Sequence, residues 1–138
     1  MPQVHINYLA VLVSAVLAFA IGGLWYSPFL FANQWVNAHG FTEEKVKEMQ
    51  QSASKAYSGS LVCMVFIALA MAVIAGYLHL ALFVQGLKLG LLAWGGFAFP
   101  LGLMATMFSD RRMIVFLIDT GYQLVYLLLM GAIIAVWH

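Results

Sequence analysis

Apolar residues run through the chain in four long stretches, which short polar segments separate. The stretches cover about residues 7–26, 57–83, 87–108 and 113–137. Each reaches the roughly 20 residues that a helix needs to cross a hydrocarbon core of about 30 Å. The runs are continuous and lack the alternation of membrane barrel strands, and a helix satisfies its own backbone polar groups in lipid. The pattern predicts an all-α fold, an integral membrane four-helix bundle.

The polar segment at residues 27–56 carries helix signals of its own. Ser27 followed by Pro28 is typical of an N-cap and a first helical residue, and Gly40 is a stop signal. Thr42 predicts a second cap, whose helix continues into the second stretch. We therefore expect a short interfacial helical loop between the first two spans. Its predicted anchors at headgroup level are Trp25, Tyr26, Pro28 and Trp35.

The remaining connections are expected to be tight turns. The segment VQGLK, residues 84–88, is the predicted turn between the second and third spans, and Asp110–Arg111 is the turn before the fourth. Such short connections require antiparallel neighbours. Pro100 lies inside the third stretch, where it removes a backbone hydrogen bond and predicts a kink, either a static bend or a hinge.

The composition indicates that lipid, rather than water, is the solvent for most of the surface. Of the 138 residues, 64% are hydrophobic and 8% are charged, against about 25% charged residues in soluble domains. The formal net charge of +1 offers no field that would attract nucleic acid. The single cysteine, Cys63, excludes an intrachain disulfide. The expected partner is the lipid bilayer, and nucleic acid is not expected.

The distribution of basic residues predicts the orientation in the membrane. The two loops on one side hold Lys45, Lys47, Lys55, Arg111 and Arg112, and the opposite side holds Lys88. Loops rich in Lys and Arg stay in the cytoplasm. We therefore expect both loops in the cytoplasm and both chain termini outside.

Small residues recur at four-residue intervals within the spans. The predicted helix-packing positions are Ser14, Ala18 and Gly22 in the first span, Ala68, Ala72 and Gly76 in the second, and Gly102 in the third. Lipid gives little hydrophobic drive for helix association, so close approach at small residues has to supply it. Packing within one chain and a homo-oligomer interface both use such positions, and four helices have surface for both.

One face of the fourth span is polar, at positions i, i+3, i+4 and i+7. The polar intramembrane site consists of Asp119, Tyr122, Gln123 and Tyr126, with Tyr26 and Ser60 expected to join from the ends of other spans. A charged Asp at the centre of a span costs about 2.5 to 3.5 kcal/mol, so this face should point into the protein. The cluster either clamps the helices by hydrogen bonds or binds a proton, cation or small polar solute.

Histidines form a second group near the expected outer face. His5, His79 and His138 stand there, where four-helix membrane cytochromes hold haem, but two of the three are at the chain ends. We therefore predict interfacial histidines, with no metal and no cofactor. The sequence has no GxSxG, HExxH or phosphate-loop motif, so an enzyme is not expected.

The opening segment INYLAVLVSAVLAFAIGGLWYSPFLFANQW carries a family resemblance, of which LWYSP is the most distinctive part. The residues that carry it are Asn7, Tyr8, Gly22, Leu24, Trp25, Tyr26, Ser27, Pro28, Phe31 and Trp35. The chain resembles, over its whole length, a bacterial family of small four-helix membrane proteins catalogued as domain of unknown function 1761. The resemblance implies four helices and a place in the bacterial cytoplasmic (inner) membrane, and it implies no activity.

The sequence is best interpreted as a small multi-pass membrane protein with a structural or interaction role. It is expected to self-associate as a homo-oligomer, with the polar stripe of its fourth helix facing inward. The alternative is a minimal oligomeric transporter or channel for a proton, ion or small polar solute that uses Asp119. No feature indicates a particular protein partner other than a second copy. A sealed interior beside Asp119 would favour the structural role, and a continuous cavity would favour transport.

Overall fold

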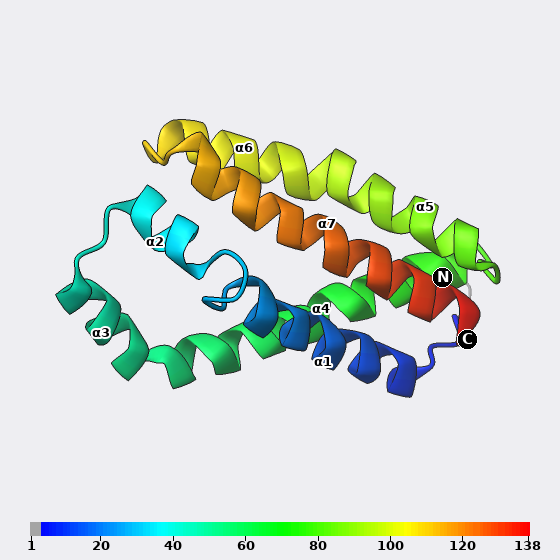
Figure 1. Ribbon diagram of the computed structural model, residues 1–138. Helices are drawn as coiled ribbons and strands as arrows, with labels where there is room; N and C mark the ends of the chain where they lie inside the picture. The colour runs from blue at the N-terminus through cyan, green and yellow to red at the C-terminus, as the bar shows by residue number, and fades with distance from the viewer. Residues whose placement is uncertain (1–3) are drawn as a thin grey trace.

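The computed structural model describes residues 4–138, which fold into helices joined by short turns (Figure 1). The helices are α1 (Tyr8–Trp25), α2 (Ala32–His39), α3 (Glu43–Gln51), α4 (Ala53–Tyr77), α5 (Phe83–Ala93), the π-helical turn η1 (Trp94–Ala98), α6 (Phe99–Phe108) and α7 (Met113–Val136). Four units, α1, α4, the continuous run α5–η1–α6 and α7, are long and apolar enough to cross a membrane. The described chain is thus all-α, with two further short helices between the first two candidate spans.

The first spanning helix begins at a side-chain cap. The Asn7 side-chain oxygen accepts hydrogen bonds from the backbone N–H groups of Leu9 and Ala10, at 3.1 and 3.2 Å. Two of the N–H groups that a helix start leaves without intrahelical partners are satisfied in this way. The cap therefore fixes the start of α1 at Tyr8.

The helix start predicted at Ser27 and Pro28 is wrong. The Ser27 hydroxyl donates to the Leu24 carbonyl at 2.6 Å, so it closes the end of α1 and cannot cap the helix that follows. α2 begins instead at Ala32. It ends as expected at Gly40, whose φ of 71° is the left-handed conformation that favours glycine.

The helix predicted from Thr42 is interrupted before the second span. The Thr42 side chain accepts from the backbone N–H of Lys45 at 3.2 Å and caps α3 as expected. α3 then ends at Gln51, and Ser52 separates it from α4. The second spanning helix therefore starts at Ala53, ahead of the expected position 57.

The turn between the second and third spans lies earlier than the sequence predicted. α4 ends at Tyr77 and α5 begins at Phe83, so the VQGLK segment is helical and not a turn. The reversal uses His79, which adopts a φ of 52°. The N–H of Leu80 bonds the Ala75 carbonyl at 3.0 Å, which is the longer bond of a Schellman motif.

Gln85 explains why VQGLK continues as a helix. Its side-chain oxygen accepts from the backbone N–H groups of Ala81 and Leu82, at 2.9 and 3.1 Å. These groups precede α5, so Gln85 acts as a cap on the first turn of the helix. In the segment that was predicted to be a turn, Gln85 thus caps the helix, and Gly86 packs closely against α7.

A π-helical turn lies directly before Pro100, and the kink expected at this proline stays a prediction. In η1 the N–H of Phe99 bonds the carbonyl of Trp94, five residues earlier. A proline inside a regular α-helix lacks an N–H, and its ring clashes with the carbonyl four residues before it. The wider π turn relieves this conflict without ending the helix.

Helix α7 lies at the centre of the arrangement. In Figure 1 it runs between the α5–α6 segment and the pair α1 and α4, and it contacts all of these helices. Val115 and Met130 of α7 are almost completely buried. The third span lies at the edge. Of the residues in its most hydrophobic 18-residue segment, only 6% are buried, whereas 39% are buried in the corresponding segment of α7.

Glycines allow α5 to approach α7 closely. A Cβ atom added to Gly86 would meet the backbone of Gly131, and one added to Gly90 would meet the backbone of Leu127. Small residues commonly bring membrane helices together in this way. The contact holds the third span against the centre of the molecule.

The predicted helix-packing positions lie against several different neighbours. Four of them are buried, namely Ser14, Ala18, Ala68 and Ala72. The glycines each face one side chain, which is Tyr122 for Gly22, Phe116 for Gly102 and Val4 for Gly76. Gly76 therefore receives the segment before α1 and not another helix. All of these contacts lie within one chain, and a homo-oligomer interface at these positions stays a prediction.

The two ends of the molecule carry different segments (Figure 1). We call the end with α2, α3 and the α6–α7 turn the loop end. The other end, with residue 4, the α4–α5 turn and the C-terminal residue, is called the terminal end. The loops that bear Lys45 and Arg111 are thus on the same end, as the order of the predicted spans requires. Which membrane side each end faces stays a prediction.

Candidate functional site

Asp119 joins three segments at the loop end of α7. Its Oδ1 atom accepts a hydrogen bond from the Tyr26 hydroxyl at 2.5 Å and another from the Trp35 indole N–H at 3.2 Å. Tyr26 belongs to the turn after α1, and Trp35 belongs to α2. Hydrogen bonds to a charged group contribute about 1.5–3 kcal/mol each. One partly buried carboxylate therefore ties α2 and the α1–α2 turn to α7.

Three tryptophans converge on the same short stretch of α7. The bonded pairs are Trp25 with the Ile118 carbonyl at 3.0 Å, Trp35 with Asp119, and Trp94 with the Thr120 carbonyl and hydroxyl at 2.9 and 3.1 Å. These tryptophans come from α1, α2 and η1. We call Trp25, Trp35 and Trp94 the tryptophan collar of residues 118–120.

Local sequence features make room for the collar. A Cβ atom at Gly121 would come within 3.2 Å of the Trp25 ring, so glycine lets the indole reach α7. Trp94 opens the π-helical turn that precedes Pro100. An indole N–H in lipid needs an acceptor, and a helix carbonyl has a second lone pair to offer. Each indole N–H of the collar thus has a hydrogen-bond acceptor on one of three consecutive residues of α7, 118, 119 and 120.

The tyrosines of the predicted stripe extend the site along α7. The Tyr122 hydroxyl donates to the Ala18 carbonyl of α1 at 2.6 Å. Its ring centroid lies 4.9 Å from that of Tyr126 and 5.7 Å from that of Tyr26. The side-chain oxygen of Gln123 is buried and, within residues 4–138, has no hydrogen-bond partner. The predicted stripe therefore faces the protein, with one acceptor left unpaired.

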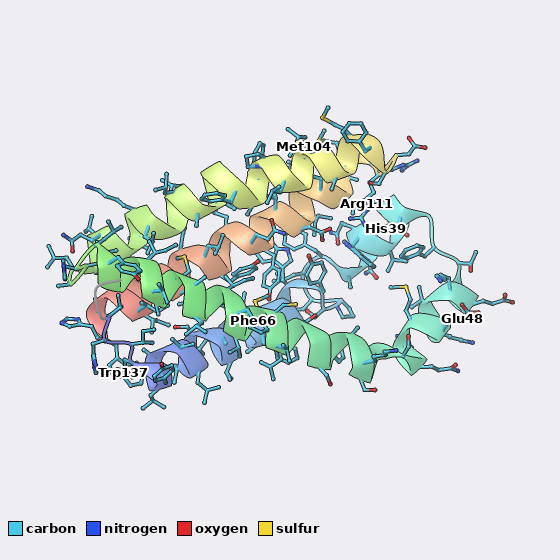
Figure 2. All side chains as sticks on the ribbon, turned by 180° about the vertical axis from the view of Figure 1, so that it is seen from behind. His39, Glu48, Phe66, Met104, Arg111 and Trp137 are labelled. Atoms are coloured by element: carbon cyan, nitrogen blue, oxygen red, sulfur yellow. The ribbon has the colours of Figure 1, made fainter. Side chains whose placement is uncertain are left out.

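His39 lies at the loop end, where Figure 2 labels it together with Arg111, and both Asp119 and Arg111 act electrostatically on its ring. The His39 ring packs against Trp35 and Phe41, with centroids 4.2 and 4.6 Å apart. Its Nε2 atom is buried without a partner among the described residues. Burial lowers the pKa of His39 below its usual 6.5, while Asp119 raises this pKa and Arg111 lowers it. His39 is therefore uncharged at neutral pH.

The predicted anchors and Ser60 have different surroundings in the structure. The polar atoms of Trp25, Tyr26 and Trp35 bond to Ile118 and Asp119 of α7, and their role as anchors at headgroup level stays a prediction. Pro28, the fourth predicted anchor, is exposed. Ser60 is also exposed, on α4, and does not join the polar site. Similar depth in the membrane was therefore not enough to predict contact.

Trp94 and His39 belong to the site around Asp119, although the sequence did not indicate them. Trp94 bonds to Thr120, and His39 packs on Trp35. A tryptophan within a lipid span carries an N–H that needs an acceptor, which was a usable signal for Trp94. The spacing of Trp35 and His39, four residues apart, places them on one face of α2. Neither signal names the partner on α7, because the collar depends on how distant helices meet.

The fold and the site define a small helical protein with four candidate membrane-spanning helices and a hydrogen-bonded carboxylate between them. The chain belongs to the family described as "Protein of unknown function (DUF1761)", whose model matches residues 9–135. The family resemblance found from the LWYSP segment is thereby confirmed. No curated protein and no solved structure matches the chain.

Proposed function

We propose that this chain is a self-associating structural or interaction protein of the membrane, in which Asp119 locks α2 onto the spanning helices. The observation that carries the proposal is the pair of bonds that Tyr26 and Trp35 donate to one carboxylate oxygen. Both donors are neutral and both belong to the same connecting segment. The carboxylate therefore holds the α1–α2 turn and α2 in a fixed position on α7.

The surroundings of Asp119 support this structural role. The collar fixes residues 118 and 120 on either side of it, and Tyr122 bonds α1 one turn further along. These contacts join α7 to α1 at two positions, Trp25 and Ala18, and to η1 through Trp94. A carboxylate held in such a network favours one fixed arrangement of the helices.

The third span supports self-association. Its exposed side carries Gly95 and Gly96, and an added Cβ atom at either one meets no other atom within 4 Å. Exposed glycines allow the backbone of another helix to approach closely. A second copy that packs on η1 would cover apolar surface that the chain itself leaves open.

Transport of a proton, ion or small polar solute is the second candidate function. It is favoured by two buried polar atoms that have no hydrogen-bond partner among residues 4–138, His39 Nε2 and Gln123 Oε1. A pocket of about 360 Å³ at the loop end also reaches Tyr26 and Trp35, the two donors to Asp119. In this interpretation a solute enters the pocket and exchanges hydrogen bonds with the Asp119 cluster.

Two substitutions at Asp119 separate the candidates. Asp119→Ala removes the acceptor, so hydrogen exchange of the α2 amides should become at least about tenfold faster, since 1.4 kcal/mol is a factor of ten. Asp119→Asn keeps an acceptor oxygen, so α2 should stay docked. The measurement is hydrogen exchange in lipid nanodiscs, combined with proton and cation flux in proteoliposomes.

Asp110→Asn is the matched control, because Asp110 is exposed and its φ of 57° suits asparagine. The structural proposal expects no Asp119-dependent flux. It is contradicted when α2 of the Asp119→Ala variant exchanges like the wild type. A flux that Asp119→Asn abolishes while α2 stays docked would instead establish transport.

A further inference from the structure

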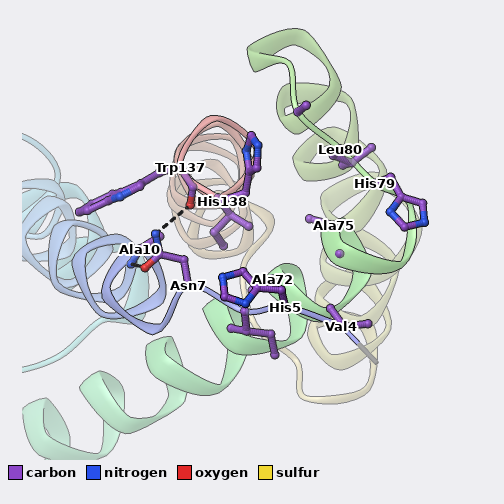
Figure 3. Close-up of a pocket in the computed structure, with 14 residues that line it drawn as sticks. Val4, His5, Asn7, Ala10, Ala72, Ala75, His79, Leu80, Trp137 and His138 are labelled. Carbon is purple, nitrogen blue, oxygen red and sulfur yellow. Dashed lines mark hydrogen bonds between the residues drawn. The ribbon is translucent and has the colours of Figure 1, made fainter. Parts of the chain in front are cut away.

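A second pocket, of about 370 Å³, lies at the terminal end of the molecule. Its floor is formed by Ala10 of α1 and by Ala72 and Ala75 of α4, all of them buried. Its rim carries three exposed imidazoles, those of His5, His79 and His138 (Figure 3). Neither Asp119 nor the collar lines this pocket, so it is separate from the site described above.

The lining of this pocket selects for an acceptor group on the ligand. None of the residues that line it is Asp, Glu, Lys or Arg. Imidazole and amide side chains supply N–H donors, and imidazole gains a second donor when it is protonated. The Nδ1 atom of His138 already meets the Ala135 carbonyl at 3.1 Å, and one N–H of the Asn7 amide is used by the Trp137 carbonyl, so His5 and His79 supply the remaining imidazole donors and His138 adds one at Nε2 when it is protonated. The lining holds no acidic side chain that would attract an organic or alkali cation, whereas neutral imidazole can bind a transition-metal ion, which is the competing interpretation. Its chemistry fits the oxygen atoms of an anion, and the alanine floor fits an apolar group.

His79 is held at the rim by an unfavourable backbone conformation. It occupies the left-handed position of the turn after α4, with a φ of 52° and its N–H bonded to the Gly76 carbonyl at 3.2 Å. Glycine is the usual residue at this position of a Schellman motif. A residue with a Cβ atom is strained there, and such strain concentrates at functional sites. The strained position places an imidazole at the pocket.

The segment that carries His5 is fixed by two separate contacts. The Val4 side chain packs where Gly76 leaves space on α4. The Asn7 amide donates to the Trp137 carbonyl at 3.4 Å while its oxygen caps α1. Figure 3 shows Val4 and the Asn7–Trp137 hydrogen bond among the residues that line the pocket. His5 is thereby brought to the rim between the ends of α4 and α7.

We propose that this pocket binds an amphiphile with an oxyanion head, that is, a carboxylate or phosphate group on an alkyl chain. The head contacts the imidazole rim, and the first carbons of the chain lie on the alanine floor. Ligand pockets commonly measure about 300–1,000 Å³, and this pocket lies within that range. A bound metal is the competing interpretation, but within residues 4–138 no three His, Cys, Asp or Glu side chains come together to hold one.

The test follows the imidazoles directly. The full chain, with ¹⁵N-labelled histidine, is placed in phosphatidylcholine nanodiscs and titrated with octyl phosphate. Signals of His5, His79 and His138 should shift and saturate together. His39, the remaining histidine of the four, lies at the loop end and serves as an internal reference. Octyl glucoside, with a neutral head, should shift none of them, and inorganic phosphate should bind at least about tenfold more weakly.

His79→Gly is the matched variant. Glycine suits the left-handed conformation, so the variant keeps the turn and loses only the imidazole. Octyl phosphate should bind it about tenfold more weakly, which corresponds to about 1.4 kcal/mol. Unchanged affinity in this variant would overturn the proposal, and so would equal shifts with octyl glucoside or no saturation with octyl phosphate.

Two further titrations identify the ligand source and test the competing interpretation. Nanodiscs that contain phosphatidylglycerol should reproduce the shifts if the ligand is a membrane lipid, whereas shifts that need added octyl phosphate indicate a free amphiphile. Zinc ions that shift all three imidazoles, with no response to octyl phosphate, would contradict the proposal and indicate a metal site.

Discussion

At the scale of single residues, Trp35 and His39 show how α2 packs against α7. They stand one helical turn apart, and Trp35 donates to Asp119 while His39 packs on its ring. The histidine contributes as a neutral aromatic, because its Nε2 atom is buried without a partner in the described part of the chain. Protonating it would place a charge where no acceptor is bonded to it.

The docking of α2 is therefore expected to depend on pH. Burial lowers the pKa of His39 in the folded protein below the 6.5 of the free group, although Asp119 opposes this shift. The unfolded segment then binds the proton first, so the stabilisation is complete above pH 6.5 and is lost as the pH falls further. Exchange-corrected protection of the α2 amides should decrease between pH 7 and pH 5.

His39→Phe is the control, because it keeps an aromatic ring that cannot take up a proton. Its α2 protection should stay level over the same pH range. Wild-type protection that rises or stays constant as the pH falls would show that His39 is not the titrating group.

At the scale of elements, glycine positions decide which helices meet. Gly86 and Gly90 of α5 face the backbone of α7, whereas Gly59 of α4 has no atom within 4 Å of an added Cβ. The residue type is the same, and only the neighbouring helix differs. The α5–α7 contact is therefore specified by a short backbone separation and not by a large buried side chain.

Substitution at Gly90 should separate these two helices. Gly90→Ala places a methyl group against the Leu127 carbonyl, and such overpacking costs about 1–3 kcal/mol. We expect the free energy of unfolding, measured by denaturation in mixed micelles, to fall by that amount.

Gly59→Ala is the matched control for this change. Alanine has the higher helix propensity and open space at that position, so stability should stay equal or rise by up to about 1 kcal/mol. Equal losses at both positions would show that helix propensity, and not the α5–α7 contact, determines the result.

At the scale of the whole molecule, the third span is the least covered of the four. It meets the rest of the chain mainly along α7, and its outer side exposes Gly95, Gly96 and Phe97. The proposed function assigns the cover of this apolar side to lipid or to a second copy. The proposed self-association belongs here, on the side of the span that faces away from α7.

Gly96→Leu tests that surface. An added Cβ atom at Gly96 meets no atom of another described segment within 4 Å, so we expect the isolated chain to accept leucine, whose side chain blocks the approach of another backbone. The association constant in lipid vesicles, measured by energy transfer between labelled copies, should fall at least about tenfold, which needs only about 1.4 kcal/mol.

Gly59→Leu makes the same change on an exposed part of α4 and should leave association unaltered. Weaker association in both variants would place the interface elsewhere. A wild-type chain that stays monomeric at every protein-to-lipid ratio would rule out self-association itself.

The sequence by itself determined the four long helices, the inward polar face of α7 and the stop and cap at Gly40 and Thr42. These features depend on lipid solvation and on local backbone chemistry, which residue types and their spacing encode directly. The family resemblance came from the same local source, the LWYSP segment. The placement of the two cationic loops at one end also followed from counting the spans.

Only the tertiary structure decided what the polar residues contact. Trp25 and Trp35 have the composition of interfacial anchors, yet they bond to α7, because the α1–α2 turn folds back over it. The turn at His79 and the cap by Gln85 likewise depend on side-chain bonds that spacing alone does not reveal. The physical reason is that an indole N–H or a hydroxyl group can donate to many chemically equivalent acceptors, and the packing of distant helices decides which acceptor it meets.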